Sequence, residues 1–174
     1  MSELTDYLVC EVERLAKGDA HLALIAANTA HIVFGDVRSR SSIPMASIVE
    51  ATREFAGAMG LRSVGLFGTR FTMQGRFFPN VFSKAGVEIV QPRQDEQAYI
   101  HDKYVNELLN GTFAPARAKR CSGWLIRNGN ETEVMLILAG SELPLLLTDL
   151  KAASVPLLDT RDIHIKAAVK LAWS

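Results

Sequence analysis

The chain has 174 residues, of which 48% are hydrophobic and 22% charged, and its formal net charge at pH 7 is zero. That balance suits one globular domain, or two small lobes that share a core. A neutral chain has no basic field for phosphates, so we expect no nucleic-acid partner, whereas low charge and many apolar residues favour self-association. The two cysteines, Cys10 and Cys121, are too few for a disulfide framework, and neither has a Cys or His at metal-ligand spacing.

Residues 1–19 predict an amphipathic helix rather than a targeting segment. Ser2 can cap this helix, and Gly18 follows its end. The expected apolar face comprises Leu4, Leu8, Val12 and Leu15. The segment lacks the basic and apolar regions of a signal peptide, and no apolar run in the chain reaches the roughly 18 residues of a membrane span. We therefore expect a cytoplasmic, reducing location and no membrane partner.

The next stretch, HLALIAANTAH at residues 21–31, changes abruptly from apolar to polar. Residues 22–27 predict a buried strand, which ends in Asn28, Thr29 and His31. In open α/β sheets, ligands bind outside the carboxyl ends of the strands, so these side chains are candidates for a site. The simpler interpretation is that Asn28 or Thr29 caps a short helix over residues 29–36. This stretch alone leaves both interpretations open.

Strands and helices alternate along the rest of the chain. Apolar runs predict strands at residues 63–67, 87–90, 134–138 and 155–158, and a short extended segment at residues 43–46. The expected helices are residues 48–59 (capped by Ser47), 73–85, 95–110, 115–127, 145–147 and 162–171. Glycines at positions 60, 86 and 111 follow three of them. Apolar strands that alternate with helices predict a parallel α/β sheet with crossover helices.

Polar residues follow four of the expected strands. The sequences are AANTAH (26–31), GTRFT (68–72), AGSE (139–142) and LDTRDIH (158–164). One polar strand end is commonplace, but four in a fold that gathers such ends along one edge predict a shared cleft. The chain has no dinucleotide fingerprint, no Walker-type GK[ST] and no Gly-x-Ser-x-Gly elbow.

Together these motifs resemble the aspartate/glutamate racemase superfamily, from about residue 21 to the C-terminus. The resemblance rests on AANTAH, SIVEAT, GTRFTMQGRF, IHDKYVNELLNGTF, AGSELPLLL and VPLLDTRDIHIKAAV, in the order and spacing of the family. It implies a parallel-sheet sandwich of two α/β lobes related by a pseudo-twofold axis, with the active site between them. Residues 1–60, with residues 155–174 packing back, would form the first lobe, and residues 61–154 the second.

The resemblance also implies a chemistry, from which this chain departs. The family needs no cofactor: one cysteine thiolate from one lobe removes the α-proton, and a cysteine thiol from the other delivers a proton to the opposite face. At the two cysteine positions this chain has Ala27 and Gly140. Cys10 and Cys121 are expected on helices far from both motifs. We therefore expect the two-thiol proton transfer to be absent.

A further departure concerns the first lobe. The family usually begins with a strand, a glycine-rich loop and a helix that this sequence does not show before residue 21, so we expect this lobe to be truncated. A missing strand exposes apolar surface and unpaired edges, which favours a homodimer or another partner.

The candidate site residues follow from the strand ends and the resemblance. Any remaining acid or base would be His31, Glu142 or His164, although Glu142 can equally anchor backbone amides. The expected substrate-binding residues are Asn28, Thr29, Thr69, Arg70, Thr72, Ser141 and Arg161, and no metal is expected.

Two hypotheses for the function remain. The first is a cofactor-independent isomerase acting on an amino acid or related carboxylate, with altered chemistry. The second is a non-catalytic member that binds a small carboxylate or a partner protein.

Overall fold

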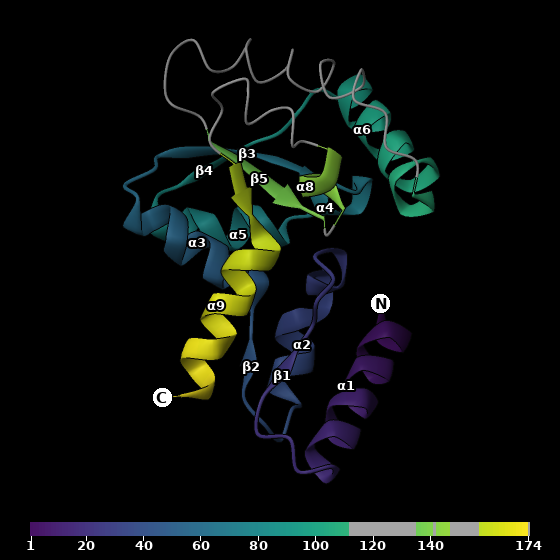
Figure 1. Ribbon diagram of the computed structural model, residues 1–174, viewed down its shortest axis with the longest axis vertical. Coiled ribbons are helices and arrows are strands. Elements are labelled where there is room, and N and C mark those ends of the chain that lie inside the picture. Colours follow the sequence, from purple (N-terminus) through teal and green to yellow (C-terminus); the bar gives the residue numbers. More distant parts are fainter. Residues whose placement is uncertain (112–134, 141, 147–156, 174) are drawn as a thin grey trace.

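The computed structural model describes residues 1–111, 135–140, 142–146 and 157–173, and it confirms a mixed α/β fold with parallel sheets (Figure 1). Four strands form the larger sheet in the order β4-β3-β5-β6. Their bounds are β3 (Ser63–Gly68), β4 (Glu88–Val90), β5 (Met135–Ala139) and β6 (Leu157–Asp159). The smaller sheet pairs β1 (Ala23–Leu24) with β2 (Met45–Ala46), and every strand pair is parallel.

The register of the larger sheet aligns the carboxyl ends of its central strands. Gly68 at the end of β3 lies opposite Ala139 at the end of β5, and Leu138 lies opposite Asp159 at the end of β6. Strands β3 and β5 are buried along almost their whole length, as expected for parallel strands covered on both faces. The residues that follow these three strands therefore meet at one edge of the sheet.

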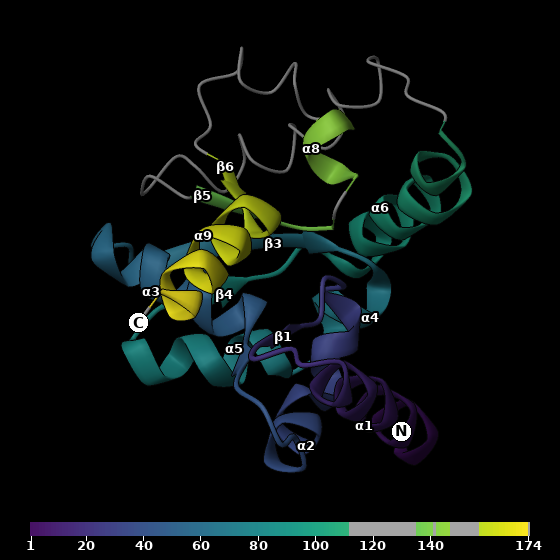
Figure 2. The same ribbon diagram turned by 60° about the horizontal axis from the view of Figure 1, so that its bottom comes forward.

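Helices cover both faces of the larger sheet (Figures 1 and 2). On one face pack α3 (Ile48–Ala58), α5 (Phe77–Phe82) and α9 (Thr160–Ala172), whose apolar side chains share a core with Val64, Leu66 and Ile137. On the other face pack α6 (Gln94–Asn106) and α8 (Leu143–Leu146), around Phe67, Leu136 and Leu138. The intervening segments are α4 (Arg70–Gln74), η2 (Ser83–Ala85) and η3 (Leu108–Asn110).

A second, smaller core surrounds the two-stranded sheet. It is formed with α1 (Ser2–Lys17), η1 (Thr29–Val33) and α2 (Phe34–Ser39), and it contains Val12, Ile25 and Phe34. Helix α9 contacts both α3 and β2, and so it connects this part of the molecule to the larger sheet. Helix α3, by contrast, shares the core of the larger sheet. The division into lobes at residue 60 stays a prediction.

Several predicted boundaries are confirmed. Ser47 caps α3, since its Oγ accepts a hydrogen bond from the N–H of Glu50 at 3.2 Å. Gly60, Gly86 and Gly111 have φ of +71°, +69° and +74° just beyond helices, a conformation that glycine adopts without steric penalty. The predicted Ser2 cap is wrong, because α1 begins at Ser2 itself and Met1 precedes it without a side-chain cap.

The strand predicted over residues 22–27 is much shorter than expected. Only Ala23 and Leu24 form β1, because the partner strand β2 offers only Met45 and Ala46 for pairing. Leu24 is 43% exposed, so this strand is covered on one face only. The helix predicted over residues 115–127 and residue Cys121 lie outside the described residues.

The single helix predicted over residues 73–85 is also wrong, because α4 and α5 are separate helices divided at Gly75. Gly75 is extended, with φ −69° and ψ 147°. A Cβ atom there would lie 2.6 Å from the Phe71 carbonyl oxygen and 2.6 Å from the Phe77 ring. The helix therefore breaks where only a glycine fits between a backbone carbonyl and an aromatic ring.

We expect Gly75→Ala to lower the free energy of unfolding by about 1–3 kcal/mol, because the added methyl group overpacks this contact. The control is Gly57→Ala within α3, where a Cβ meets nothing within 4 Å and where we expect a gain of about 0.5–1 kcal/mol. Urea denaturation of both variants measures the difference. Equal stability of the two variants would contradict this account.

Candidate functional site

Three threonine hydroxyls form a triangle between η1 and the start of α4. The Oγ1 atom of Thr29, at the start of η1, lies 2.9 Å from that of Thr69 and 3.0 Å from that of Thr72. Thr69 and Thr72 are themselves 3.1 Å apart, and Thr69 caps α4 by accepting the N–H of Thr72. Thr72 is fully buried, whereas the other two are partly exposed. The triangle thus presents rotatable hydroxyls, each a donor and an acceptor, at the carboxyl end of β3.

Asn28 connects the end of the segment after β1 to the ends of β5 and β6. Its Nδ2 donates to Thr160 Oγ1 at 3.1 Å, and Thr160 Oγ1 donates to the carbonyl oxygen of Leu138 at 2.9 Å. Asn28 is only 6% exposed, and its Oδ1 has no hydrogen-bond partner within the described part of the chain. A buried carbonyl oxygen without a partner costs about 1–3 kcal/mol, so this atom is suited to accept from a bound donor.

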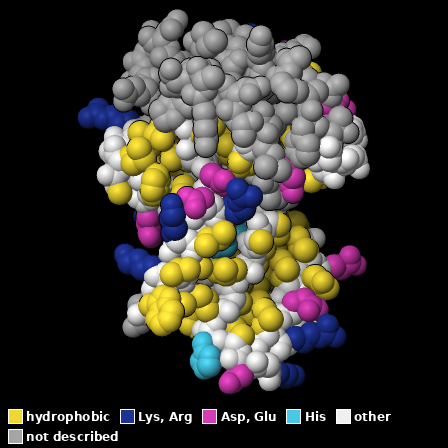
Figure 3. All heavy atoms as spheres, viewed as in Figure 1, with side chains coloured by type: hydrophobic (Ala, Val, Ile, Leu, Met, Phe, Trp, Pro, Cys, Tyr) yellow, Lys and Arg dark blue, Asp and Glu magenta, His cyan; other side chains and the backbone are white. Residues whose placement is uncertain are grey.

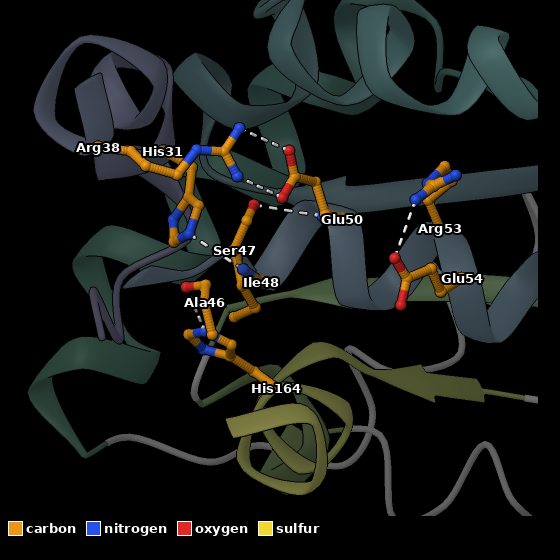
Figure 4. Close-up of polar contacts among 9 residues, drawn as sticks. All are labelled: His31, Arg38, Ala46, Ser47, Ile48, Glu50, Arg53, Glu54 and His164. Carbon is orange, nitrogen blue, oxygen red and sulfur yellow. Dashed lines mark hydrogen bonds and ion pairs between the residues drawn. The ribbon is translucent and has the colours of Figure 1, made fainter. Parts of the chain in front are cut away.

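The two predicted histidines lie on either side of the turn between β2 and α3 (Figure 4). His31 accepts the backbone N–H of Ile48 at Nε2, 3.1 Å away, so its proton is on Nδ1, which donates to the carbonyl oxygen of Ala27 at 3.0 Å. His164 donates from Nε2 to the carbonyl oxygen of Ala46 at 3.0 Å. Both ring nitrogens of His31 are therefore engaged with backbone groups, which favours a structural role.

Burial keeps both imidazoles neutral. It lowers the pKa of His31 from 6.5 to about 4, an effect that the bond to Ala27 opposes and the nearby His164 reinforces. Burial also lowers the pKa of His164, against the bond to Ala46. The rings lie 6.0 Å apart edge to face, and His31 stacks on Phe34 with a centroid distance of 4.8 Å. Neutral rings fit this apolar setting, whereas two imidazolium ions would repel each other.

Glu142 follows β5 and is paired with a side chain from α6. Tyr104 donates its hydroxyl to Glu142 Oε2 at 2.6 Å. A Cβ atom on Gly140, two residues before Glu142, would lie 2.8 Å from the Tyr104 oxygen. The phenol therefore lies at the carboxyl end of β5, in the space where a side chain of residue 140 would be.

The structure distributes the remaining predicted residues differently. Arg70 and Arg161 are exposed, and Arg161 Nη2 pairs with Asp159 Oδ2 at 3.1 Å. The backbone N–H of Arg70 donates to His101 Nδ1 at 3.2 Å. Ser141 lies outside the described residues. Of the predicted binding residues, Asn28 and the three threonines of the hydroxyl triangle are therefore the ones that hydrogen bonds link to the strand ends.

Three residues of this region were not among the predicted site residues. Thr160 could have been found, because it follows an expected strand, as Thr69 does. Tyr104 and His101 lie on α6, within the stretch IHDKYVNELLNGTF that carries part of the resemblance, and this stretch follows no expected strand end. Within the described ranges, no group of three or more His, Cys, Asp or Glu side chains is placed to hold a metal ion. No described helix is long and apolar enough to cross a membrane.

The chain matches the family profile described as Asp/Glu/Hydantoin racemase over residues 2–168. An aspartate racemase homologue from Pyrococcus horikoshii OT3 is 31% identical with a TM-score of 0.82, over 98% of this chain and 74% of that one. A candidate Asp/Glu racemase from Yersinia pestis is 25% identical with a TM-score of 0.87, over the same shares. Glutamate racemase from Francisella tularensis in complex with D-glutamate shares the fold at 17% identity and a TM-score of 0.72, over 99% of this chain and 64% of that one.

The buried histidine predicts acid destabilisation. Between pH 6.5 and about 4 the unfolded chain binds a proton at residue 31 that the native chain does not, so the free energy of unfolding falls as the pH falls. The contribution of His31 is roughly 3 kcal/mol at most. We expect urea denaturation of the parent chain at pH 7, 5.5 and 4 to show this fall in the free energy of unfolding. The His31→Gln variant should show a smaller fall over the same pH range.

The exposed His21 is the matched control position, and His21→Gln is measured at the same three pH values. If lowering the pH destabilised His31→Gln as much as the parent chain, the assignment of this pH dependence to His31 would be wrong.

Proposed function

Because this chain belongs to the Asp/Glu/Hydantoin racemase family, we propose that it binds an amino acid or a related small carboxylate at the meeting point of its strand ends, without the two-thiol proton transfer that the resemblance implies. The observation that carries this proposal is the pairing of a hydroxyl triangle with the unpartnered, buried Oδ1 of Asn28. Binding of this kind is common to the isomerase and the non-catalytic hypotheses.

The hydroxyl triangle suits a carboxylate. The hydroxyls of Thr29 and Thr69 are partly exposed and bond to each other at 2.9 Å, so a ligand oxygen can take over hydrogen bonds that they now make internally. Hydrogen bonds from hydroxyls to an ionised carboxylate are shorter and stronger than those between neutral groups. Replacing the hydrogen bonds between the hydroxyls by bonds to a ligand therefore favours an anionic ligand over a neutral one.

Asn28 is placed to accept a hydrogen bond from a donor group on the same ligand. Its Nδ2 is held by Thr160, which is held in turn by Leu138, so the amide plane is fixed and Oδ1 keeps one direction. An ammonium or hydroxyl group placed there would satisfy the buried oxygen, which has no partner among the described residues. A ligand with a carboxylate and a nearby donor, as in an α-amino acid, matches both features.

The cysteine positions support the loss of thiol chemistry. Ala27 contributes an exposed methyl group and its carbonyl oxygen, and Gly140 has no side chain. Cys10 is exposed on α1, and Cys121 lies outside the described residues. Racemisation requires an acid and a base on opposite faces of one carbon, and neither alanine nor glycine carries a proton for this purpose.

Calorimetric titration with L- and D-aspartate and L- and D-glutamate tests the binding proposal. We expect at least one of the four to bind and to raise the melting temperature, and Thr29→Val to weaken that binding by at least tenfold, through loss of a hydrogen bond to a charged group. The control is Thr52→Val, which removes a buried threonine hydroxyl bonded to the Ile48 carbonyl oxygen in α3. No binding of any of the four ligands, or equal losses in both variants, would overturn the proposal.

Homodimerisation is the second part of the proposal. Apolar side chains gather on the face shown in Figure 3, below a group of charged ones. Leu24 on β1 is 43% exposed, Val169 on α9 is 52% exposed and Trp173, just after α9, is 87% exposed. Large exposed apolar areas of this kind mark association surfaces.

We expect sedimentation equilibrium to give twice the 19.1 kDa chain mass and Val169→Glu to shift the protein toward monomer, whereas a monomeric parent chain would contradict the proposal.

A further inference from the structure

The space beside Gly140 is filled by the phenol ring of Tyr104. A Cβ atom on residue 140 would lie 2.8 Å from Oη, 2.9 Å from Cζ and 3.0 Å from Cε2 of this tyrosine. Side chains do not approach one another this closely, so no residue larger than glycine fits at position 140 while Tyr104 keeps its place. The phenol therefore occupies the position that the resemblance assigns to the second reactive side chain.

This position lies at the same sheet edge as the hydroxyl triangle. Gly68 and Ala139 are partners in the parallel register, so the next residues, Thr69 and Gly140, follow neighbouring strands at the same level. Thr69 belongs to the triangle, and the Tyr104 oxygen lies against Gly140. A ligand held by the triangle is thereby brought toward the phenol rather than toward a thiol.

Glu142 completes a pair that can carry a proton. The distance of 2.6 Å between Tyr104 Oη and Glu142 Oε2 is in the range of a charge-assisted O–H···O⁻ bond. Tyr104 is 6% exposed and Glu142 is half-buried, so the pair is largely shielded from water. A carboxylate at this distance can accept the phenolic proton when the phenol oxygen accepts another.

From this geometry we propose that Tyr104 and Glu142 exchange the α-proton of the bound amino acid on one face only. The Cα–H bond breaks and its proton bonds to Tyr104 Oη, while the phenolic proton passes to Glu142 Oε2. The electron pair stays on Cα, delocalised into the ligand carboxylate, and the reverse step returns a proton to the same face. Residue 27 is alanine and delivers no proton from the opposite face, so the configuration is retained. This inference rests on the proposed binding function.

A purely structural role makes a different prediction for Tyr104. Its ring belongs to the core around Phe67, Leu136 and Leu138 on that face of the sheet. If packing were its only role, Tyr104→Phe would keep the ring in place and leave proton exchange unchanged. Likewise, Glu142→Gln would still accept the phenolic hydrogen bond through its amide oxygen, so a loss of exchange in this variant indicates proton transfer rather than packing.

The experiment follows deuterium incorporation at Cα of L- and D-aspartate and L- and D-glutamate in D₂O by NMR. Chiral chromatography of the same samples determines the configuration, and calorimetry determines the dissociation constant of each variant. We expect exchange with retention of configuration. Exchange should fall at least 100-fold in Tyr104→Phe and in Glu142→Gln, as is typical when a general acid–base group is removed, while the dissociation constant stays within threefold. Tyr99→Phe, another tyrosine on α6, is the matched control and should exchange at the parent rate.

The outcomes separate this inference from the binding proposal. Binding without exchange overturns the inference and leaves the binding proposal standing, and absence of binding overturns both. Exchange that Tyr104→Phe lowers no more than Tyr99→Phe does also overturns the inference, because the proton then travels by another route. Racemisation of a ligand would overturn the single-face assignment, since it requires a second proton carrier on the other side of Cα.

Discussion

The candidate site depends on the register of three parallel strands. Because Gly68 is level with Ala139, and Leu138 with Asp159, the chain leaves β3, β5 and β6 at one edge of the sheet. Parallel pairing thus brings Thr69 and Thr160, 91 positions apart in the sequence numbering, within reach of the segment after β1. A shift of one residue in any of these pairs would turn the same side chains to the opposite face.

The segment after β1 is held in place by groups that the family resemblance treats as candidates for chemistry. His31 bonds to the backbone at Ala27 and Ile48, and His164 bonds to Ala46, so two neutral rings fix the ends of a strand pair that is only two residues long. This cross-linking compensates for the short ladder, which by itself provides few backbone hydrogen bonds. His31 is unsuited to proton transfer, because protonation would cost the hydrogen bond that its Nε2 accepts from the N–H of Ile48.

The position of the second expected cysteine is filled by a residue that is distant in the sequence. Replacement of a side chain by glycine alone would leave a void, which in a packed interior is destabilising. Here Tyr104 fills that space from another helix and brings a hydroxyl and its partner Glu142 to the same place. A side chain at position 140 would therefore fit only if the Tyr104 ring moved from its present place.

The sequence by itself determined the α/β class, the alternation of elements, the caps at Ser47 and at the left-handed glycines, and the strand end that carries Thr69. These features are local: hydrophobic periodicity and turn chemistry act within a few residues. Only the tertiary structure decided that β1 would be so short, that Gly75 would divide a helix, and that the histidines would bond to backbone groups. It also decided that Tyr104 lies against Gly140, because that contact joins residues 36 positions apart and depends on how α6 packs on the sheet.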